Sequence, residues 1–555
     1  MSIKPKFLIP AIGAAVVVVG GIAMYSYMIG GPSGGISDAT ASAKLVPDDA
    51  MMATYIATDS KAWSKLEQFG TPEAQKIVAA ELKNFNENLS SDDSITYDKD
   101  LKPWVGGVMV AVLPPQKVQP AQNNTENNTQ NNTQASAEPN ILLVVGIKDK
   151  VEALNFSNKL KQQKNVKTKE IKYKGQTIQE TKGKGSPTYS TILDDRVLFS
   201  LSQNALTQAI DTYKGEPSFL RKSGASQVMG NNLNLENTLA QVYVPDYSDM
   251  VKQLIATNPR AQQLPPQTLE QLKQIKSVVA GIGVDEGGLR IKANTNLDAQ
   301  KVKYQYEKTP GKVLSQLPQN TIALISGGGI SKWWAAFVEQ AKDNPELNVT
   351  LQQARGQLKL VNIDLDKDVF GWMDGEFGIA AIPIEQGLLK QIGFGGAFLF
   401  HTGDRQTAEA TFSKLDNLAK AQSIQIAQKD IDGKSITEWQ IPGQGALLAH
   451  GWLDEQTAIL AVGGPIAETL TQKGLQSLNS GETFQGITAT LPQENGGYFY
   501  LDMEKALPIV NRFSPQTPEA IAILNSIRGI GVTATSPNKS LTQVEMLLAL
   551  KKNQK

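Results

Sequence analysis

Cysteine is absent from this chain of 555 residues, and histidine occurs only twice. The lack of cysteine excludes disulfide bonds, thiolate nucleophiles and zinc or iron–sulfur sites built on thiolates. An excess of charge of either sign is also missing, because 54 lysines and arginines balance 54 aspartates and glutamates. No global field would therefore attract a polyanion, and we expect no nucleic-acid partner.

Long hydrophobic runs are equally scarce, and the one that could cross a bilayer lies at the N-terminus. Residues 7–29 carry no charge; Lys4 and Lys6 precede them, and the next basic residue is Lys44. About 20 apolar residues suffice to span a membrane, and basic residues favour the cytoplasmic side. We predict that residues 1–30 form a cytoplasmic tip and a transmembrane helix. This helix contacts the lipid bilayer through residues 7–29 and anchors the chain in it.

An alternative for this segment is a cleaved signal peptide, because Ala41 and Ala43 form an Ala-x-Ala pattern. The apolar run is longer than the usual core of a signal peptide, and the alanine pair lies well beyond it. The uncleaved anchor is therefore the preferred interpretation. It makes the chain a single-pass membrane protein with its N-terminus in the cytoplasm and its bulk on the other side.

Two further segments have little apolar content. Residues 31–44 read "GPSGGISDATASAK", a composition typical of a flexible tether, so folding is expected to begin near Leu45. Residues 116–140 are polar and repeat Asn and Thr, and such a segment cannot bury enough surface to order itself. We predict a disordered loop there.

The second half of the chain repeats the first in order. "KLVPDDAMMATYIATDSKAW" parallels "SQLPQNTIALISGGGISKWW", and "YDKDLKPWVGGVMVAVLPP" parallels "LDKDVFGWMDGEFGIAAIP". Further echoes follow, ending with "GIGV" at 281–284 and again at 529–532. Ordered matches of this kind indicate duplication. We predict a first module over 45–300, a linker over 301–314 and a second module over 315–555.

Each module begins with an alternating apolar stretch and a capped helix, and it continues with strands around turn signals such as "YKGQ" and "DIDGKS". Strands joined by short turns pair antiparallel, and helices then cover one face of the sheet. We predict an α+β fold made of two tandem homologous modules, each an antiparallel sheet with helices packed on one face, preceded by one transmembrane helix.

The N-terminal anchor, "LVPDDAMMATYIATD", the turn "DLKPWVGG" and the hairpin-rich repeats together resemble the membrane-anchored proteins of cyanobacteria grouped as the DUF3352 family. The similarity covers nearly everything from about Leu45 onward. It implies a bacterial source and exposure of the folded part to the periplasm or the thylakoid lumen. It supplies no activity and no catalytic residues.

One stretch of the second module is rich in carboxylates: Asp364, Asp366, Asp368, Asp374 and Glu376. The stretch does not match a calcium loop of the EF-hand type. Val369 stands where that loop needs its turn glycine, and Gly375 stands where it needs its final glutamate. The two copies share only Asp-Lys-Asp and a tryptophan, Trp104 or Trp372. We interpret the stretch as a capped turn with a packed tryptophan, and a weak ion site in the second module is the alternative.

Other polar patterns also favour structural roles. The glycines at 327–329 lack the spacing of a phosphate-binding loop, and Gly281-x-Gly283 is followed by Glu286 where a dinucleotide fingerprint needs glycine. His401 and His450 end apolar strands. The adjacent Trp333 and Trp334 cannot both face one core, so one of them is expected to be exposed.

We therefore predict no catalytic, cofactor-binding or metal-binding residues and no cofactor. The leading hypothesis is a non-enzymatic, membrane-tethered extracytoplasmic protein that binds or scaffolds a protein partner of the bacterial envelope or thylakoid. The alternatives are a carrier or chaperone for an apolar ligand or lipid and a hydrolase that uses the acidic residues of the second module.

Overall fold

The structure is a computed structural model that describes residues 36–58, 60–88, 97–114, 140–161, 167–182, 187–230, 233–256, 272–302, 305–342 and 344–553. The predicted anchor over 1–30 and almost all of the predicted loop over 116–140 lie outside these ranges. Within them, no helix has both the length and the apolar content that a membrane crossing requires.

The chain divides into two compact units. Unit 1 comprises residues 1–68, 76–285 and 290–298, and unit 2 comprises residues 69–75, 286–289 and 299–555. The two short segments 69–75 and 286–289 thus belong to unit 2, although they lie inside the module predicted over 45–300. Gly70 N, for example, donates to Lys551 O over 2.8 Å.

The sheet of unit 1 has the strand order β4-β5-β6-β7-β3-β2-β1-β8-β9-β10, and the neighbours from β4 to β9 pair antiparallel. Its strands are β1 Met52–Ile56, β2 Val105–Leu113, β3 Asn140–Ile147, β4 Lys167–Tyr173, β5 Gln176–Lys182, β6 Thr188–Leu193, β7 Arg196–Ser200, β8 Thr238–Val244, β9 Ile275–Val284 and β10 Gly288–Leu297.

The sheet of unit 2 has the order β14-β15-β16-β17-β13-β12-β11-β18-β19-β20, with every neighbouring pair antiparallel. This is the order of unit 1 with ten added to each strand number. The strands are β11 Ala323–Gly328, β12 Glu376–Pro383, β13 Phe394–His401, β14 Gln425–Ile431, β15 Lys434–Ile441, β16 Gly445–Trp452, β17 Thr457–Val462, β18 Tyr498–Asp502, β19 Ile527–Asn538 and β20 Leu541–Leu550. The α+β class and a large antiparallel sheet are therefore confirmed.

Short helices connect the strands. Up to residue 298 they are α2 Ile36–Ala43, α3 Ser60–Leu66, α4 Pro72–Asn88, the π-helix η1 Tyr97–Leu101, α5 Lys150–Lys161, α6 Gln203–Tyr213, the 3₁₀ helix η2 Phe219–Arg221, α7 Ala225–Met229 and α8 Tyr247–Ala256. Beyond it they are α10 Lys312–Gln316, α11 Ile330–Lys342, α12 Pro345–Leu360, the π-helix η3 Leu365–Gly371, α13 Arg405–Ala421, α14 Gly464–Thr471, the 3₁₀ helix η4 Leu478–Ser480, α15 Glu482–Thr488, α16 Met503–Phe513 and α17 Pro518–Leu524.

The flexible tether predicted over 31–44 is corrected over most of its length, because 36–43 form α2. Ala39 and Ala43 are 2% and 0% exposed and join the core of unit 1. Buried Ser42 accepts a hydrogen bond from Arg196 Nε over 3.2 Å. Small residues suit a linker, but alanine is also the best helix former and can pack closely, so composition alone misassigned this segment.

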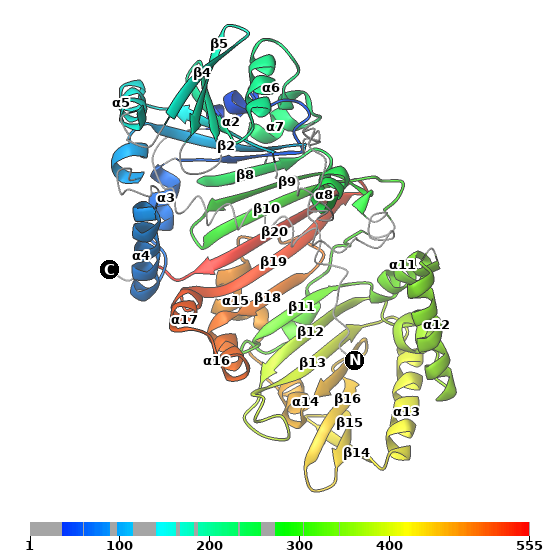
Figure 1. The fold of residues 1–555 in the computed structure, drawn as a ribbon. Helices are drawn as coiled ribbons and strands as arrows, with labels where there is room; N and C mark the ends of the chain where they lie inside the picture. Colours follow the sequence, from blue (N-terminus) through cyan, green and yellow to red (C-terminus); the bar gives the residue numbers. More distant parts are fainter. Residues whose placement is uncertain are drawn as a thin grey trace, which may run out of the picture. The chain divides into compact units, whose positions relative to one another are not determined.

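In unit 2, helices pack on both faces of the sheet, and the prediction of helices on one face is wrong. Leu399 joins the core formed with α10, α14 and α15. Its neighbour Phe400 points to the opposite face, where it packs with Trp372, Ala408 and Phe412 of η3 and α13. We call the face of Leu399 the inner face and that of Phe400 the outer face. Figure 1 shows α11, α12 and α13 at one end of these strands and α16 and α17 at the other.

Candidate functional site

The outer face of unit 2 is apolar along β17, β13, β12, β11 and β18, and over residues 530–534 of β19 and 544–548 of β20. Its residues follow from the alternation along each strand and from the cross-strand register. Not one of these side chains carries a charge or a hydrogen-bonding group. They are Leu460 and Val462; Gly396, Phe398 and Phe400; Phe377, Ile379, Ala381 and Pro383; Ala323, Ile325 and Gly327; Phe499 and Leu501; Ile530, Val532 and Ala534; and Val544, Met546 and Leu548.

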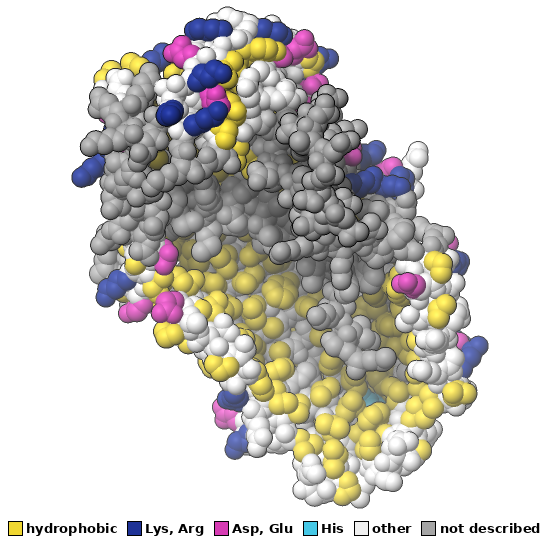
Figure 2. Space-filling model, in the orientation of Figure 1, with side chains coloured by type: hydrophobic (Ala, Val, Ile, Leu, Met, Phe, Trp, Pro, Cys, Tyr) yellow, Lys and Arg dark blue, Asp and Glu magenta, His cyan; other side chains and the backbone are white. Residues whose placement is uncertain are grey.

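Part of this face is open to solvent. Ile325 is paired with Ile379 and with Phe499, and the three are 51%, 37% and 38% exposed. Figure 2 shows a hollowed apolar surface over β11, β12, β13 and β18, between α16–α17 on one side and α11–α12 on the other. The solvent-facing side of an antiparallel sheet is ordinarily polar. The outer face instead has the composition of a protein core, although three of its described residues are exposed.

The corresponding positions of unit 1 differ in exposure. Thr54 of β1 pairs with Val110 and Val242, as Ile325 pairs with Ile379 and Phe499. Thr54 is 1% and Val242 2% exposed. An open apolar face at these positions is therefore a feature of unit 2 and does not follow from the shared strand order.

Helices cover one end of the outer face. Trp372 follows η3 and is 2% exposed, with its ring packed edge-on against Phe400 and Phe412 at centroid distances of 5.5 and 5.9 Å. Trp372 Nε1 donates to Asp368 O over 2.9 Å. This cluster ends the open part of the face at the C-terminal end of β13.

A pocket of about 620 Å³ lies at the other end, where β12 ends and β13 begins. Pro383 belongs both to the outer face and to the pocket wall, and Ile509 of α16 also lines the pocket. Three cationic side chains, Lys390, Lys505 and Arg512, also line the pocket, together with Glu385. The open apolar face thus ends at a pocket in which cations outnumber carboxylates.

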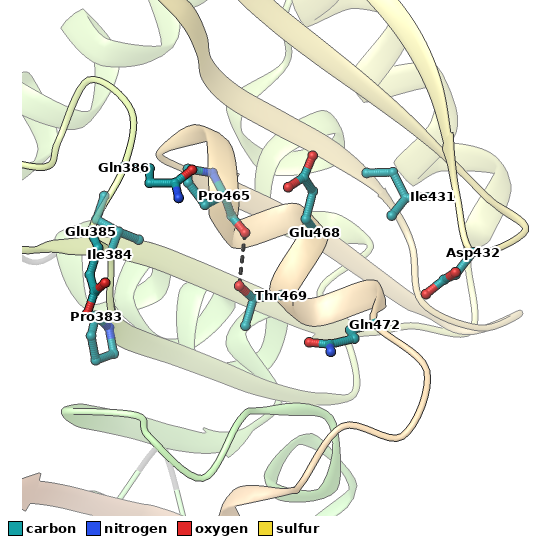
Figure 3. A pocket seen from close by; sticks show the side chains of 10 residues that line it. All are labelled: Pro383, Ile384, Glu385, Gln386, Ile431, Asp432, Pro465, Glu468, Thr469 and Gln472. Carbon is teal, nitrogen blue, oxygen red and sulfur yellow. Dashed lines mark hydrogen bonds between the residues drawn. The ribbon is translucent and has the colours of Figure 1, made fainter.

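A second pocket, of about 540 Å³, is polar and open (Figure 3). Its carboxylates do not converge, since Figure 3 shows Glu385 and Asp432 at opposite sides with Glu468 between them. Glu468 accepts a hydrogen bond from Lys429, and Asp432 accepts one from Lys473 N over 3.1 Å. Neither pocket is a closed apolar chamber.

The acidic stretch of the second module is held by donors of its own chain. Asp364 caps η3 by accepting from the N–H groups of Asp366 and Lys367, each over 3.0 Å. Asp366 accepts from Trp334 Nε1 and Arg355 Nη2, each over 2.8 Å. These contacts are those of a capped turn. The carboxylate oxygens that accept these hydrogen bonds are engaged by donors of the same chain.

The remaining carboxylates of the stretch are similarly engaged. Asp368 is 6% exposed and accepts from Lys414 Nζ over 2.6 Å and from Asp364 N over 2.7 Å. Asp374 accepts from Gly403 N over 3.2 Å. Glu376, 4% exposed, accepts from Lys312 N over 2.8 Å at the start of α10. Among the described residues, no group of three or more histidines, aspartates and glutamates is arranged to hold a metal ion.

These environments lower the pKa values of two of the carboxylates and raise that of the third. The hydrogen bond from Arg355 lowers the pKa of Asp366 below the ordinary 3.8, with help from Trp334 and against the effect of burial. Burial opposes ionisation of Asp368, but the hydrogen bonds from Lys414 and the Asp364 N–H outweigh it and lower the pKa. Burial raises the pKa of Glu376 above 4.5 despite the amide donors around it.

We expect an acid-dependent contribution of Asp366 to stability. A lowered pKa in the folded state stabilises the fold above pH 3.8, and this stabilisation disappears as the pH falls through the lowered value. The free energy of unfolding of wild type should therefore exceed that of Asp366→Asn above pH 3.8, and the difference should shrink as the pH falls through the lowered pKa of Asp366. Urea unfolding of both proteins across this range measures the difference; a gap that widens on acidification would contradict the assignment.

The two histidines lie in separate contacts. His401 Nδ1 is 3.5 Å from Thr457 Oγ1. His450 is buried, stacks on Phe412 at 4.5 Å and lies with Nε2 2.8 Å from Asp416 Oδ1. Sequence reasoning missed this pairing, since Asp416 is 34 residues from His450 and on another element. The pair ties α13 to β16, and Asp416 also accepts a hydrogen bond from Trp439 Nε1 over 2.6 Å, so within the described part of the chain the pair contacts an indole and not a hydroxyl nucleophile.

The glycine patterns and the tryptophan pair also have structural explanations. A Cβ on Gly283 would lie 2.4 Å from Glu236 O, so close packing requires this glycine. Gly329 has a φ of +64° and its N–H donates to Gly375 O over 2.9 Å. Trp334 stacks on Phe370 at 4.1 Å, whereas Trp333 is 39% exposed, as the adjacency of the two rings predicted.

Sequence reasoning also missed the outer face itself. A signal was present, because "FGIAAIP" and "FGGAFLFH" are apolar at nearly every position, and strands of this kind are built to be buried on both faces. The alternation of a half-exposed strand was assumed instead.

Fold and site together define an α+β protein with a large antiparallel sheet and an exposed apolar face. The model of DUF3352, described as a protein of unknown function, matches residues 11–550. The chain therefore belongs to the DUF3352 family, as its resemblance predicted.

None of the curated proteins matches the chain. Among solved structures, it is similar to crystal forms III and IV of TP0453, each with a TM-score of 0.26 and 8% identity; these cover 47% of this chain and 82% or 81% of the other. Crystal form I of TP0453 has a TM-score of 0.24 and 11% identity, over 47% of this chain and 80% of the other.

Proposed function

We propose that this protein is a non-enzymatic binding protein whose outer face in unit 2 receives an apolar partner. It is held at a membrane by residues 7–29, with its bulk in the periplasm or thylakoid lumen of a bacterium. The observation that carries the proposal is the uniformly apolar outer face with Ile325, Ile379 and Phe499 exposed at its centre. Exposed apolar patches of this kind mark interaction surfaces.

The energetics support a partner. Full burial of a large apolar side chain stabilises by roughly 1.5–3 kcal/mol. Ile325, Ile379 and Phe499 are 51%, 37% and 38% exposed, so covering what remains of the three gives roughly 2–4 kcal/mol of contact free energy. A membrane tether would also concentrate the face near partners of the same membrane. The matching strand orders of the units support two tandem copies of one module, of which the second carries this face.

The polar residues support a non-enzymatic role. The carboxylates of the acidic stretch accept hydrogen bonds from their own chain, which disfavours the hydrolase alternative. Both pockets are open, so a carrier that encloses its ligand is less well supported than a surface that the partner reaches from the side.

Site-specific photo-crosslinking tests the proposal. In the full chain, expressed in cells of the source organism, Ile325 or Phe499 is replaced by benzoylphenylalanine. We expect irradiation to give a covalent adduct at each position, because the occupant of the face would lie against the photoreactive ketone.

Val151 of α5 provides the matched control. It is 66% exposed and apolar but belongs to unit 1 and not to the outer face. Adduct yields at 325 and 499 should exceed the yield at 151 several-fold. Equal yields at the three positions would show that the outer face has no occupant.

A further inference from the structure

The chemistry of the outer face indicates the kind of occupant. Protein–protein interfaces carry about one hydrogen bond per 100–200 Å², and their energetic centres are rich in tryptophan, tyrosine and arginine. On the outer face, the positions of β17, β13, β12, β11 and β18 that form its floor carry none of these residues and no side-chain donor or acceptor. Such a floor complements a hydrocarbon chain better than it complements another protein surface.

The dimensions also fit hydrocarbon. From Pro383 to Ile379, short of the covered cluster around Trp372, the floor follows β12 over four residue steps, or about 13 Å at 3.3–3.4 Å per residue. One leaflet of a bilayer has a hydrocarbon thickness of about 15 Å. The floor is about 20 Å wide across the five strands β17, β13, β12, β11 and β18. An extended acyl chain would therefore fit along β12 over most of its length.

The pocket at the end of the floor supplies the complementary charge. Arg512 Nη1 donates to Gln391 O over 2.6 Å, which uses one of the five N–H groups of the guanidinium. Lys505 Nζ lies 2.7 Å from Asp502, whose side chain is 2% exposed. Lys390 is exposed on the same wall. Spare donors from Arg512 and Lys390 suit a phosphate group.

We propose that the outer face binds an acyl chain of an anionic lipid and that Lys390, Lys505 and Arg512 hold the lipid's phosphate in the adjoining pocket. The inference rests on the proposed function and specifies its ligand. Pro383, which belongs to both the floor and the pocket, marks the junction between chain and headgroup.

Three probes separate the contributions of the ligand. The first is a lysophosphatidic acid with a photoreactive diazirine in its single acyl chain. The second is the monoacylglycerol with the same chain and no phosphate, and the third is glycerol 3-phosphate, added only as a competitor. The full-length protein is labelled in detergent solution over a range of probe concentrations, and mass spectrometry locates the labelled peptides.

Wild type should be labelled by both acyl probes on peptides of β11, β12 and β18. Half-saturation by the lysophosphatidic acid should need roughly tenfold less probe, because charge-assisted hydrogen bonds to phosphate add affinity. Glycerol 3-phosphate should compete weakly, since it lacks the chain.

Double variants test the phosphate contact and the acyl-chain contact separately. Lys390→Gln with Arg512→Gln should raise the half-saturation concentration of the lysophosphatidic acid about tenfold and leave that of the monoacylglycerol unchanged. Lys420→Gln with Lys473→Gln removes the same charge from exposed positions outside the pocket and should change neither. Ile325→Asp with Phe499→Asp should abolish labelling by both; if this pair lowers the melting temperature, Ile325→Ser with Phe499→Ser repeats the test.

The outcomes that would overturn the inference are distinct. Equal half-saturation by both acyl probes in wild type would refute the phosphate contact and leave the proposed apolar binding intact. Strong competition by glycerol 3-phosphate would indicate a site for free phosphate instead. If the Ile325 and Phe499 variants are labelled as strongly as wild type, both the inference and the proposed function are refuted. If the wild type is a dimer that those variants convert to a monomer, the occupant of the face is a second copy of the chain.

Discussion

Trp372→Ala should lower the free energy of unfolding by roughly 3–5 kcal/mol, the usual cost of truncating a buried large aromatic side chain to alanine. Trp372 is 2% exposed and contacts two aromatic rings, and its Nε1–H is bonded to Asp368 O. Truncation leaves a cavity between η3 and α13. Urea unfolding followed by circular dichroism measures the loss.

Trp104 of unit 1 repeats the arrangement and should repeat the result. It is 3% exposed, donates from Nε1 to Asp100 O over 2.7 Å and lies 5.4 Å from the ring of Phe156. Trp104→Ala should therefore destabilise unit 1 by a similar amount.

Asp364→Asn is the matched control for the acidic stretch. Asparagine caps helices about as well as aspartate, so the hydrogen bonds to the N–H groups of Asp366 and Lys367 can persist and stability should change by less than about 0.5 kcal/mol. A calcium site would reverse this order, because loss of one carboxylate would remove stabilisation by the ion. Melting curves with calcium and with a chelator distinguish the two; a calcium-dependent rise that Asp364→Asn abolishes would refute the structural interpretation.

Gly529→Ala should destabilise unit 2 by about 1–3 kcal/mol or more through overpacking. A Cβ at this position would lie 2.2 Å from Ile487 Cδ1 and 2.5 Å from Leu501 O. The Ile487 methyl group can move, but the carbonyl oxygen of the paired strand can do so only by disturbing the sheet. The glycine repeated in "GIGV" is thus explained by the close approach of β18 and α15.

Gly356 of α12 is the control for this substitution. A Cβ there would meet nothing within 4 Å, and alanine is favoured over glycine inside a helix by roughly 0.5–1 kcal/mol. Gly356→Ala should therefore raise the urea midpoint, whereas Gly529→Ala lowers it. If both substitutions have similarly small effects, the atoms around Gly529 can move to accommodate a Cβ without cost to the sheet.

Local patterns predicted much of the fold. Strand and turn signals identified the α+β class, because alternation and turn residues act over a few neighbouring positions. The capped turn at Asp364 and the packed Trp372 could be predicted for the same reason, since the cap spans three residues and the tryptophan N–H reaches a carbonyl four residues earlier. Similar sequence segments that occur in the same order in both halves of the chain predicted two modules.

Patterns that depend on distant contacts could not be predicted. Residues 36–43 were assigned to a tether on composition, and only their packing in the core of unit 1 distinguishes a helix from a linker of the same composition. The His450–Asp416 pair joins a strand to a helix, so neither residue signals the other in the sequence.

The sequence by itself determined the alternation that places Ile325, Ile379 and Phe499 on one face, the absence of polar groups on that face, and the glycines and aspartates that shape the turns. These properties are covalent and local. The tertiary structure alone decided that helices cover one end of the outer face and leave the rest exposed beside a cationic pocket. Exposure is a property of what packs against a residue, and here the covered end is built by Trp372, Ala408 and Phe412, which come from separate elements that local patterns do not bring together.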